Sequence, residues 1–385
     1  MRPVNHNRKN KVAGIYIHIP YCKTRCTYCD FYTLTNESQI DTFVDALRRE
    51  AEMRKKELPE TVKTIYFGGG TPSRLHHNHF GQIFDTLFNH YTIDADAEIT
   101  VEANPDDLSD DYIRMLAKLP VNRLSIGIQS FDDDELKFLS RRHSSRQAID
   151  AVRKCQEQGF RNISIDLMYG LPGQSLELWE RNLDQAIALG TQHISAYHLI
   201  YEEKTRMYSL LKSGKIRQVD ETSSTAMFSK LIDRLTADDF IHYEISAFGK
   251  EGHFSQHNSA YWQNKKYVGL GPAAHSYDGD NRSLNVTSLN RYIKGIESGT
   301  PDRNIEQLSL NEKYNEFILT GLRTMWGINL TELKNRFGEH FLRFCIENAQ
   351  KYLDQKLLNR EENTLKLTRE GIFISDGIMS DLMQV

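Results

Sequence analysis

The sequence lacks any apolar run close to the ~20 residues that a helix needs to span a bilayer. Its first residues are polar and contain no apolar core of a secretion signal. Internal repeats and low-complexity segments are also absent, which excludes solenoid architectures. We therefore expect a globular protein, with one large domain and a smaller one because 385 residues exceed the usual size of a single core.

The sequence also lacks a large net charge and a high cysteine content. The formal net charge is −4 and no cluster of Lys and Arg marks a binding face, so we expect no nucleic-acid partner. Five cysteines, of which three are clustered, argue against a disulfide framework and for a cytoplasmic location. Residues 1–11 are basic; we predict a disordered tail, with peripheral contact to an anionic membrane as the alternative.

What the sequence does contain is a cysteine cluster directly after an apolar run. Cys22, Cys26 and Cys29 form a Cys-x3-Cys-x2-Cys pattern after Val12–Ile19, which is predicted to be a buried strand. Three thiolates on one loop can hold three of the four irons of a cubane iron–sulfur cluster and leave the fourth open. A zinc loop is the alternative, although zinc sites usually take four ligands in paired sets.

Strand-like and helix-like segments alternate from residue 12 to about residue 200. The expected strands are Val12–Ile19, Lys63–Phe67, Ala97–Glu102, Arg123–Ile128, Asn162–Leu167 and His193–Leu199. The expected helices are Ser38–Glu57, His76–Tyr91, Ser109–Lys118, Asp132–Leu139, Ser145–Gln158 and Ser175–Leu189. Six strand–helix units predict an α/β fold with a parallel sheet, best described as a partial (β/α)6 barrel of the TIM type.

Candidate site residues follow the ends of these strands, where barrels of this type have their catalytic and binding groups. They are Gly69, Gly70 and Thr71 after the second strand, Glu102 at the end of the third, Gln129 at the end of the fourth, Arg141 after a short helix, and Asp166 near the end of the fifth. Taken singly, each has a structural explanation, such as a tight turn, a cap or a surface ion pair. Together they suit one small ligand that carries an amine, a carboxylate and a ribose.

These motifs, together with the segment from Asp166 to Gly173, resemble the radical S-adenosylmethionine (radical SAM) superfamily. The resemblance is strongest to the branch that contains the oxygen-independent coproporphyrinogen III dehydrogenases and related haem chaperones, and it extends from about residue 12 to the C-terminus. It implies a [4Fe–4S] cluster on Cys22, Cys26 and Cys29, with S-adenosyl-L-methionine (SAM) chelating the unique iron. The SAM contacts that it implies are Tyr16, Tyr28, Gly69, Gly70, Thr71, Glu102, Gln129, Arg141 and Asp166.

One departure separates the two relatives in that branch. The dehydrogenases carry a fourth cysteine two places after the third, where this chain has Phe31. The lead before the first strand is also shorter than the dehydrogenases are expected to have. Both differences favour a haem carrier that passes haem to an unidentified acceptor protein, in which the cluster supports folding, association or release. The alternative is a radical enzyme that cleaves SAM and oxidises a tetrapyrrole side chain.

A second motif lies further along the chain. His257, Asn258, Tyr261 and Trp262 resemble the His-Asn-x-x-Tyr-Trp motif that is linked to haem binding in the haem chaperones, which implies that His257 contacts haem. The alternative is that His257 is a core residue whose ring nitrogens are already hydrogen-bonded. His275 is the second choice of haem ligand.

The expected domain organisation follows from these segments. We expect a tail over residues 1–11, a radical SAM core over 12–240, a segment with the candidate haem motif over 241–299, and a smaller winged-helix-like α+β domain over 300–385. This last domain has no basic recognition helix, so we expect it to serve as a lid or an interaction module. Whether the protein is a monomer or a dimer stays open.

Overall fold

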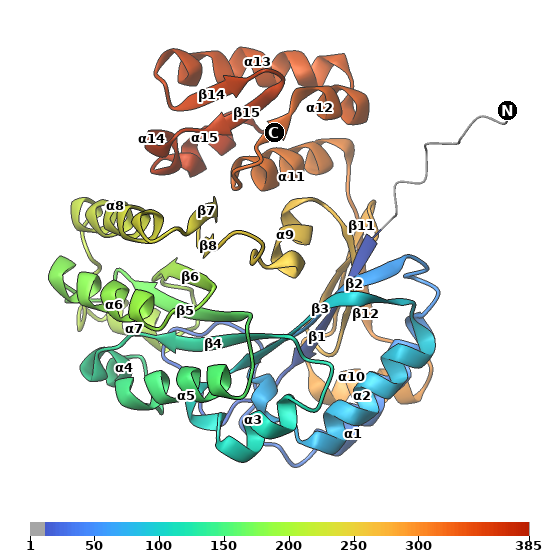
Figure 1. Ribbon diagram of the computed structural model, residues 1–385. Helices are drawn as coiled ribbons and strands as arrows, with labels where there is room; N and C mark the ends of the chain where they lie inside the picture. Colours follow the sequence, from blue (N-terminus) through green and yellow to red (C-terminus); the bar gives the residue numbers. More distant parts are fainter. Residues whose placement is uncertain (1–11, 385) are drawn as a thin grey trace, which may run out of the picture.

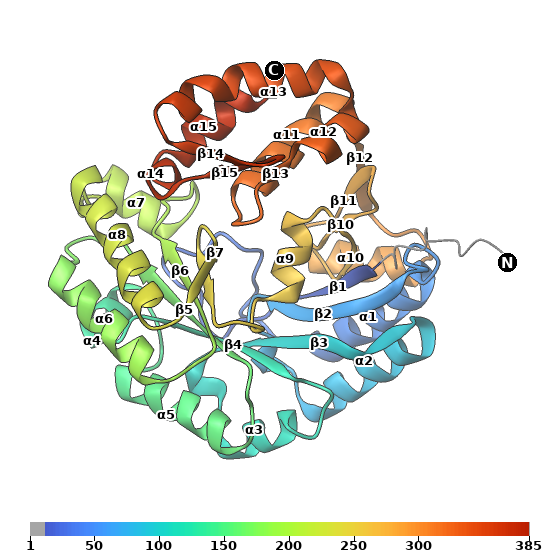
Figure 2. The ribbon, with the colours of Figure 1, turned by 45° about the horizontal axis from the view of Figure 1, so that its top comes forward.

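A twelve-stranded sheet organises the molecule, as the computed structural model shows for residues 12–384 (Figures 1 and 2). The residues of the expected N-terminal tail, 1–11, lie outside the described residues. The central strands are β1 (Val12–Ile19), β2 (Thr61–Gly69), β3 (Ile93–Ala103), β4 (Arg123–Gln129), β5 (Ile163–Tyr169) and β6 (His193–His198). They are parallel and adjacent in chain order, which confirms the partial (β/α)6 barrel.

Amphipathic helices cover the outer face of these strands (Figure 2). They are α1 (Ile40–Arg54), α2 (His77–His90), α3 (Asp110–Leu116), α4 (Asp133–Phe138), α5 (Ser145–Glu157) and α6 (Leu176–Ala188), with the short 3-10 turns η1 (Pro72–Arg74) and η2 (Pro105–Asp107). Each expected helix forms inside its predicted range because its apolar residues recur at helical spacing. The side chains of Phe67, Phe80 and Trp179, for example, are fully buried between sheet and helices.

Short strands extend the sheet at both edges. They are β7 (Ile241–Glu244), β8 (Ala247–Gly249), β9 (Lys266–Leu270), β10 (His275–Tyr277), β11 (Asn281–Asn285) and β12 (Arg303–Gln307). Strand β9 pairs with β1 in parallel, and the other five join antiparallel. The helices between and before them are α7 (Arg206–Lys212), α8 (Glu221–Ala237), α9 (Gln256–Trp262) and α10 (Leu289–Glu297). Helix α7 lies in the polar stretch between β6 and α8.

The C-terminal part is a separate α+β domain with its own core, as expected. Its elements are α11 (Leu310–Leu322), β13 (Ile328–Asn329), α12 (Leu330–Phe337), α13 (Glu339–Asp354), β14 (Leu358–Glu361), β15 (Thr364–Leu367), α14 (Arg369–Ile372) and α15 (Ser375–Leu382). The strands form an antiparallel sheet. The last helical stretch of the chain is divided into α14 and α15. The break coincides with a contact between the rings of Phe373 and Phe228 of α8, whose centroids are 5.4 Å apart.

This domain lies over both ends of the barrel sheet (Figure 1), and ion pairs join it to them. Arg369 pairs with Asp233 of α8 and Arg323 pairs with Glu244 of β7 on one side, while Glu316 pairs with Arg282 of β11 on the other. The domain therefore spans the gap between the two ends of the open barrel. Within residues 12–384, no helix combines the length and the apolar character required to cross a membrane.

Candidate cofactor site

The three clustered cysteines lie on the loop that follows β1. Cys22 is buried, Cys26 and Cys29 are half-buried, and all three are free thiols. Across the described chain, no three His, Cys, Asp or Glu side chains converge on a single metal ion. Ligands of a cubane need not converge in this way, because each thiolate binds a different iron. The donor set, three soft sulfurs on one loop, therefore fits an iron–sulfur cluster better than a mononuclear metal ion.

Backbone hydrogen bonds hold this loop against three other parts of the barrel. The Cys22 amide donates to the Leu34 carbonyl (2.9 Å), and the Thr27 amide donates to the carbonyl of Leu139, which follows α4 (3.2 Å). The amide of Met207, in α7, donates to the Thr27 carbonyl (2.9 Å). The thiols are thus positioned by main chain on both sides of the loop, which is the preorganisation that a cluster site needs.

Two polar side chains reach the thiols directly. A hydrogen bond of 3.2 Å joins Cys22 Sγ and Thr71 Oγ1, and Arg141 Nη1 donates to Cys26 Sγ at 3.4 Å. Burial raises the pKa of the Cys22 thiol to about 11, against the Thr71 hydrogen bond, which lowers it. A bound iron would have to displace the thiol protons, because thiolates are the metal ligands.

The glycine segment allows two pieces of main chain to meet beside the cysteine loop. Gly69 has a φ of +102°, and a Cβ there would lie 2.5 Å from the His18 ring. A Cβ on Gly70 would lie 2.8 Å from two carbonyl oxygens where β1 leads into the loop. Close approach requires a glycine at both positions, and the positive φ is a further requirement at Gly69 alone. The result is that Thr71 is placed against Cys22.

Two carboxylates with perturbed acidity face the interior of the barrel. Glu102 accepts a hydrogen bond from the Tyr66 hydroxyl (2.7 Å), and Asp166 accepts one from Ser125 Oγ (3.3 Å). Burial, and to a smaller extent the charge of Asp166, raise the pKa of Glu102 to about 7, against the Tyr66 hydrogen bond, which lowers it. Burial also raises the pKa of Asp166, to about 6. A cationic ligand would favour the ionised form of both groups.

Arg141 links the cysteine loop to the glycine segment. Its Nη2 donates to Asn104 Oδ1 (2.6 Å) and to the Gly127 carbonyl, and Asn104 Nδ2 donates to Thr71 Oγ1 (3.3 Å). Arg141 Nε is buried and has no hydrogen-bond partner among the described residues. This donor is available to a ligand, and an unpaired buried donor is costly without one.

The remaining predicted SAM contacts lie around the same region. A hydrogen bond of 3.1 Å joins the Tyr16 hydroxyl to His18 Nδ1, and the Tyr16 ring stacks near Tyr66 with centroids 6.3 Å apart. Tyr28 packs beside an apolar cluster under the cysteine loop. Gln129 ends β4 with a φ of +73°, a conformation that costs a non-glycine residue energy and recurs at functional sites.

His257 lies in the wall of the barrel, where its ring stacks against that of Tyr66 with centroids 5.0 Å apart and lies 6.4 Å from that of Tyr16. It is 1% exposed, and its Nδ1 and Nε2 form hydrogen bonds of 2.7 Å with Thr64 Oγ1 and the Tyr261 hydroxyl. The ring occupies space that the missing side chain of Gly14 leaves, since a Cβ there would lie 3.3 Å from it. Ligation of haem iron would require His257 to exchange one of these bonds, so its role in haem binding stays a prediction.

Several polar residues of this wall were not predicted from the sequence. Glu98 accepts hydrogen bonds from the amides of Gln256 and His257, at 3.1 and 3.0 Å, and so satisfies the first turn of α9. The Arg123 side chain is buried beside it, with Nε 3.9 Å from a Glu98 oxygen. The one sequence feature that could have indicated a polar inner wall is alternation along the strands. In β2, for example, Thr64 and Tyr66 alternate with the apolar Ile65 and Phe67.

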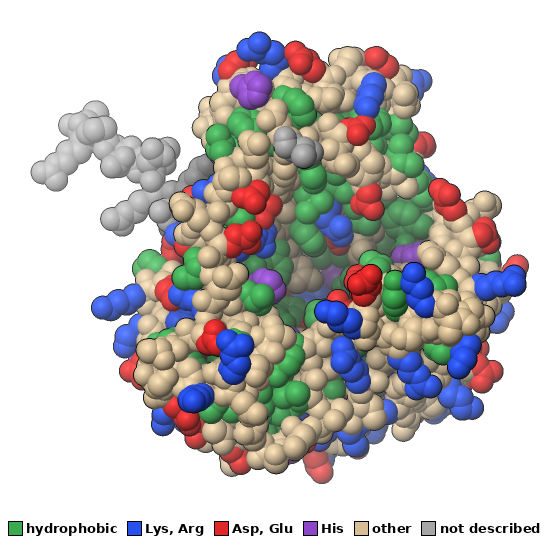
Figure 3. Space-filling model, turned by 180° about the vertical axis from the view of Figure 1, so that it is seen from behind, with side chains coloured by type: hydrophobic (Ala, Val, Ile, Leu, Met, Phe, Trp, Pro, Cys, Tyr) green, Lys and Arg blue, Asp and Glu red, His purple; other side chains and the backbone are tan. Residues whose placement is uncertain are grey.

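The interior of the barrel is open toward the C-terminal domain. Figure 3 shows the molecule hollowed between these two parts, with hydrophobic and His side chains inside the hollow. The three cysteines, the two carboxylates and Arg141 have chemistry that fits a sulfur-bound cluster and a charged small ligand beside it.

Comparisons with known proteins agree with this geometry. The family model of the radical SAM superfamily matches residues 16–186, and that of the HemN C-terminal domain matches residues 308–374. Heme chaperone HemW from Bacillus subtilis (strain 168) is 34% identical over 372 residues, which cover 95% of this chain and 98% of that protein. Heme chaperone HemW from Lactococcus lactis subsp. lactis (strain IL1403) is 33% identical over 375 residues, which cover 97% and 98%.

A solved structure shares the whole fold. Coproporphyrinogen III oxidase (HemN) from Escherichia coli superposes with a TM-score of 0.84 over 97% of this chain and 91% of that one, at 19% sequence identity. Identity this low shows the fold alone. The barrel and its cysteine loop define a protein of the radical SAM superfamily. Within that superfamily, the chain belongs to the HemW family of haem chaperones.

Proposed function

We propose that this protein is a haem carrier, which binds haem, passes it to an acceptor protein, and holds a [4Fe–4S] cluster with exchangeable SAM. The observation that carries the proposal is the similarity to heme chaperones HemW over nearly the full length of both chains. The residue at position 31 supports it. The Phe31 side chain is 58% exposed, so it is not retained for core packing, and it stands where the dehydrogenases are expected to have a fourth cysteine.

In this proposal, the cysteine loop and its surroundings hold the cluster and SAM. Cys22, Cys26 and Cys29 would be the cluster ligands, and the bound cluster would supply an iron with an open position and the capacity to transfer an electron. Thr71 and Arg141 hold the thiols by hydrogen bonds. The same Arg141, through its free Nε, and the ionised Glu102 and Asp166 would orient the charged groups of SAM.

The proposed SAM contacts divide into side chains and main chain. Gly69 and Gly70 would offer main-chain groups at short range, since they have no side chains. Tyr16, Tyr28 and Gln129 would line the same space. None of these residues needs to act as a proton donor or acceptor in a carrier, and we assign no catalytic role to any of them.

For haem, we retain His257 as the proposed contact and the exposed His275, in β10, as the second choice. We also propose a cytoplasmic location and the domain division at residues 12–240, 241–299 and 300–385. The acceptor is a protein of unknown identity. A membrane contact would fall to the basic residues 1–11, which lie outside the described residues.

One reconstitution experiment tests both the cluster and the haem. Wild-type protein is reconstituted with iron and sulfide without oxygen, in parallel with a variant in which Cys22, Cys26 and Cys29 are all replaced by Ser and with His257→Ala. Iron and sulfide are quantified, and haem is titrated by absorbance. We expect about four irons per wild-type chain, none in the triple variant, and normal iron with weaker haem binding in His257→Ala.

The two halves of the proposal fail separately in this design. Full iron and sulfide in the triple variant would remove the cluster assignment and leave haem binding intact. A wild-type protein that does not bind haem would remove the carrier function. Unchanged haem affinity in His257→Ala would transfer the ligand role to His275, for which His275→Ala is the matched variant.

A further inference from the structure

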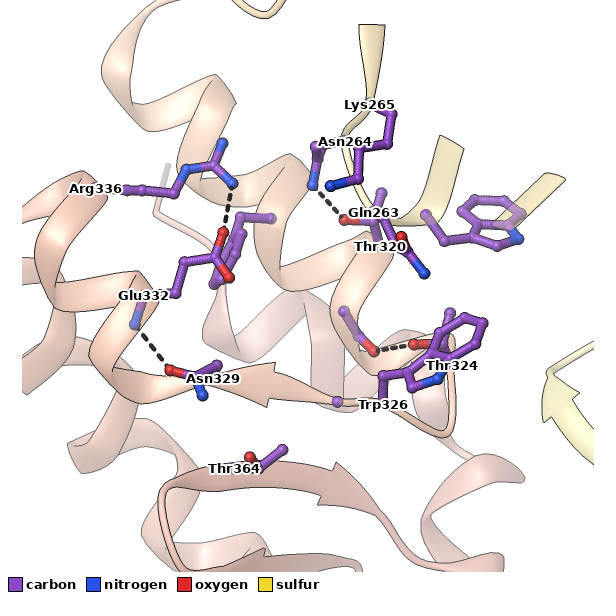
Figure 4. Close-up of a pocket in the computed structure, with 14 residues that line it drawn as sticks. Gln263, Asn264, Lys265, Thr320, Thr324, Trp326, Asn329, Glu332, Arg336 and Thr364 are labelled. Carbon is purple, nitrogen blue, oxygen red and sulfur yellow. Dashed lines mark hydrogen bonds and ion pairs between the residues drawn. The ribbon is translucent and has the colours of Figure 1, made fainter. Parts of the chain in front are cut away.

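A cleft of about 350 Å³ separates the end of α9 from the C-terminal domain (Figure 4). On the barrel side it is lined by Trp262, the last residue of α9, and by Lys265. On the other side it is lined by Phe317, Trp326 and Arg336. Two of the three tryptophans of the chain therefore face one cavity. Its volume falls within the range of small-molecule sites.

The aromatic rings of the cleft are held in place by their neighbours. The Arg323 guanidinium lies 4.8 Å from the centre of the Trp262 ring and is itself paired with Glu244 at 2.6 Å. The Trp326 ring lies 6.1 Å from that of Tyr243 and 6.4 Å from that of Phe254, centre to centre. Both indoles are nevertheless half-exposed. Rigid and accessible aromatic faces are typical of sites for flat ligands.

Two cations stand at the rim of this aromatic cleft. Lys265 is exposed, and whereas its neighbour Lys266 pairs with Glu60, Lys265 makes no ion pair with any residue in the range 12–384. The Arg336 guanidinium lies 5.0 Å from the centre of the Phe317 ring. Among the described residues its only acidic neighbour at pairing distance is Glu332, which lies at 3.4 Å on the same helix and also lines the cleft. Such a pair is worth little at the surface, so Arg336 can turn to a stronger anion. In Figure 4, Arg336 extends from the C-terminal domain and Lys265 from the barrel side.

We propose that this cleft binds the tetrapyrrole, with the macrocycle against Trp262 and Trp326 and the two propionates on Lys265 and Arg336. The inference rests on the proposed haem carriage and adds the place and the contacts. A planar aromatic ring that carries carboxylates is the ligand that indole faces and paired cations recognise. The site also gives the His-Asn-x-x-Tyr-Trp motif a second contribution. While His257 is buried at one end of α9, Trp262 lines the cleft at the other end.

Within residues 12–384, the residues that line the cleft include no side chain that usually binds haem iron. Among the described residues that line the cleft, none is His, Cys, Met or Tyr. The cleft would therefore bind the ring and its carboxylates and leave the axial ligand to another part of the chain. Binding of metal-free protoporphyrin IX should therefore depend on the cleft as strongly as binding of haem does.

Titration of both porphyrins tests the proposal. Haem and protoporphyrin IX are titrated into the full-length wild type, the double variant Lys265→Glu/Arg336→Glu, and the control Lys215→Glu/Arg343→Glu, which reverses two exposed cations away from the cleft. We expect the cleft variant to bind both porphyrins at least tenfold more weakly than the wild type. The affinity of the control variant should stay within twofold of the wild type. Raising the salt concentration should weaken porphyrin binding by the wild type more than binding by the cleft variant.

Each outcome bears on one claim. Equal affinity of wild type and cleft variant for both porphyrins would overturn the cleft proposal and leave haem carriage standing. Weaker binding of haem alone would overturn it too, because it would indicate an effect on iron ligation. A wild type that binds neither porphyrin would overturn haem carriage itself. Trp326→Leu, with its fold checked by circular dichroism, is a second test. Loss of the indole should weaken the binding of both porphyrins without altering the salt dependence of binding.

Discussion

At the scale of single residues, the candidate site depends on close contact between two strand ends. Gly69 ends β2 beside His18, and this contact brings Thr71 to Cys22. Two separate demands fall on Gly69, a positive φ and the absence of a side chain. A second glycine, Gly159, has the same φ of +102° with open space around it, so the two demands can be separated experimentally.

We predict that Gly69→Ala destabilises the protein more than Gly159→Ala. Both substitutions place an L-residue at positive φ, which costs about 1–2 kcal/mol. Only Gly69→Ala also puts a Cβ 2.5 Å from the His18 ring, so its cost should exceed that of the control by about 1 kcal/mol or more. Urea unfolding gives both free energies. Equal values would show that the contact between β1 and β2 is not tight.

Glu102 should give SAM binding a pH dependence. Its pKa is raised to about 7 by burial and by the nearby Asp166, so it loses its charge as the pH falls from 8 to 6. Because SAM carries a sulfonium and an ammonium group, its affinity should fall about tenfold over that interval. Equilibrium dialysis of SAM against cluster-loaded protein measures this. Tyr66, Asp166 and Arg123 act on the Glu102 carboxyl. Tyr16, Tyr197 and Tyr261 also lie near it, since its charge raises the pKa of each.

The control for this prediction is Glu102→Gln, which keeps the shape and removes the charge. It should bind SAM weakly at every pH between 8 and 6. Full pH dependence in Glu102→Gln would assign the titration to another group, with Asp166, whose pKa is about 6, as the first candidate.

Residue chemistry could be predicted from the sequence where it depends on local spacing. The cysteine pattern and the strand-end residues are local features, and they indicated the region in which the structure places the cysteines, the glycines and both carboxylates. The environment of His257 could not be predicted, because it is created by Gly14 and Thr64 on two strands more than 190 residues earlier in the chain. A sequence motif shows the presence of a histidine but not its burial.

At the scale of secondary structure, a buried charged network fixes α1 to the edge of the sheet. Arg54 donates to Glu50 (3.0 Å), to the Gly269 carbonyl (2.6 Å) and to Ser276 Oγ (2.9 Å). Glu50 in turn accepts hydrogen bonds from the Gly271 amide at 2.8 Å and from the Tyr292 hydroxyl at 2.6 Å. Both charged side chains are almost fully buried. The network joins α1 to β9, β10 and α10.

We predict that Arg54→Met lowers the free energy of unfolding by about 3–5 kcal/mol, because it leaves the Glu50 carboxylate buried without its cation. Arg48→Met is the matched control on the same helix. Arg48 pairs with Asp45 at the surface and donates to Thr86 Oγ1 (3.1 Å), so its replacement should cost only about 1 kcal/mol. Urea unfolding of the two variants decides the matter, and a small, equal loss would contradict the structural importance of the network.

Elements could be predicted from the sequence where they are long. The six parallel strands and their helices carry enough periodic residues to define each segment. Strands β10, β11 and β12 are short, and β12 is largely exposed, so no apolar pattern marks them. Pairing with a distant strand, rather than local preference, makes them strands.

At the scale of the whole molecule, the C-terminal domain connects the two ends of an incomplete barrel. The ion pairs from Arg369, Arg323 and Glu316 reach partners on α8, β7 and β11. The existence of this domain could be predicted from its helical pattern. Its position could not, because it depends on side-chain pairs between segments that are 34 to 136 residues apart. That position creates the cleft in which we propose that the tetrapyrrole binds.

The central claim is that this barrel carries haem and does not oxidise porphyrinogens. The most direct measurement is to incubate the cluster-loaded, haem-free protein without oxygen with coproporphyrinogen III, SAM and a strong reductant, and to analyse the porphyrins by mass spectrometry beside an authentic dehydrogenase. We predict that the vinyl product forms only with the dehydrogenase, while the same protein sample binds haem. Formation of the vinyl product by this protein over repeated turnovers would contradict the claim.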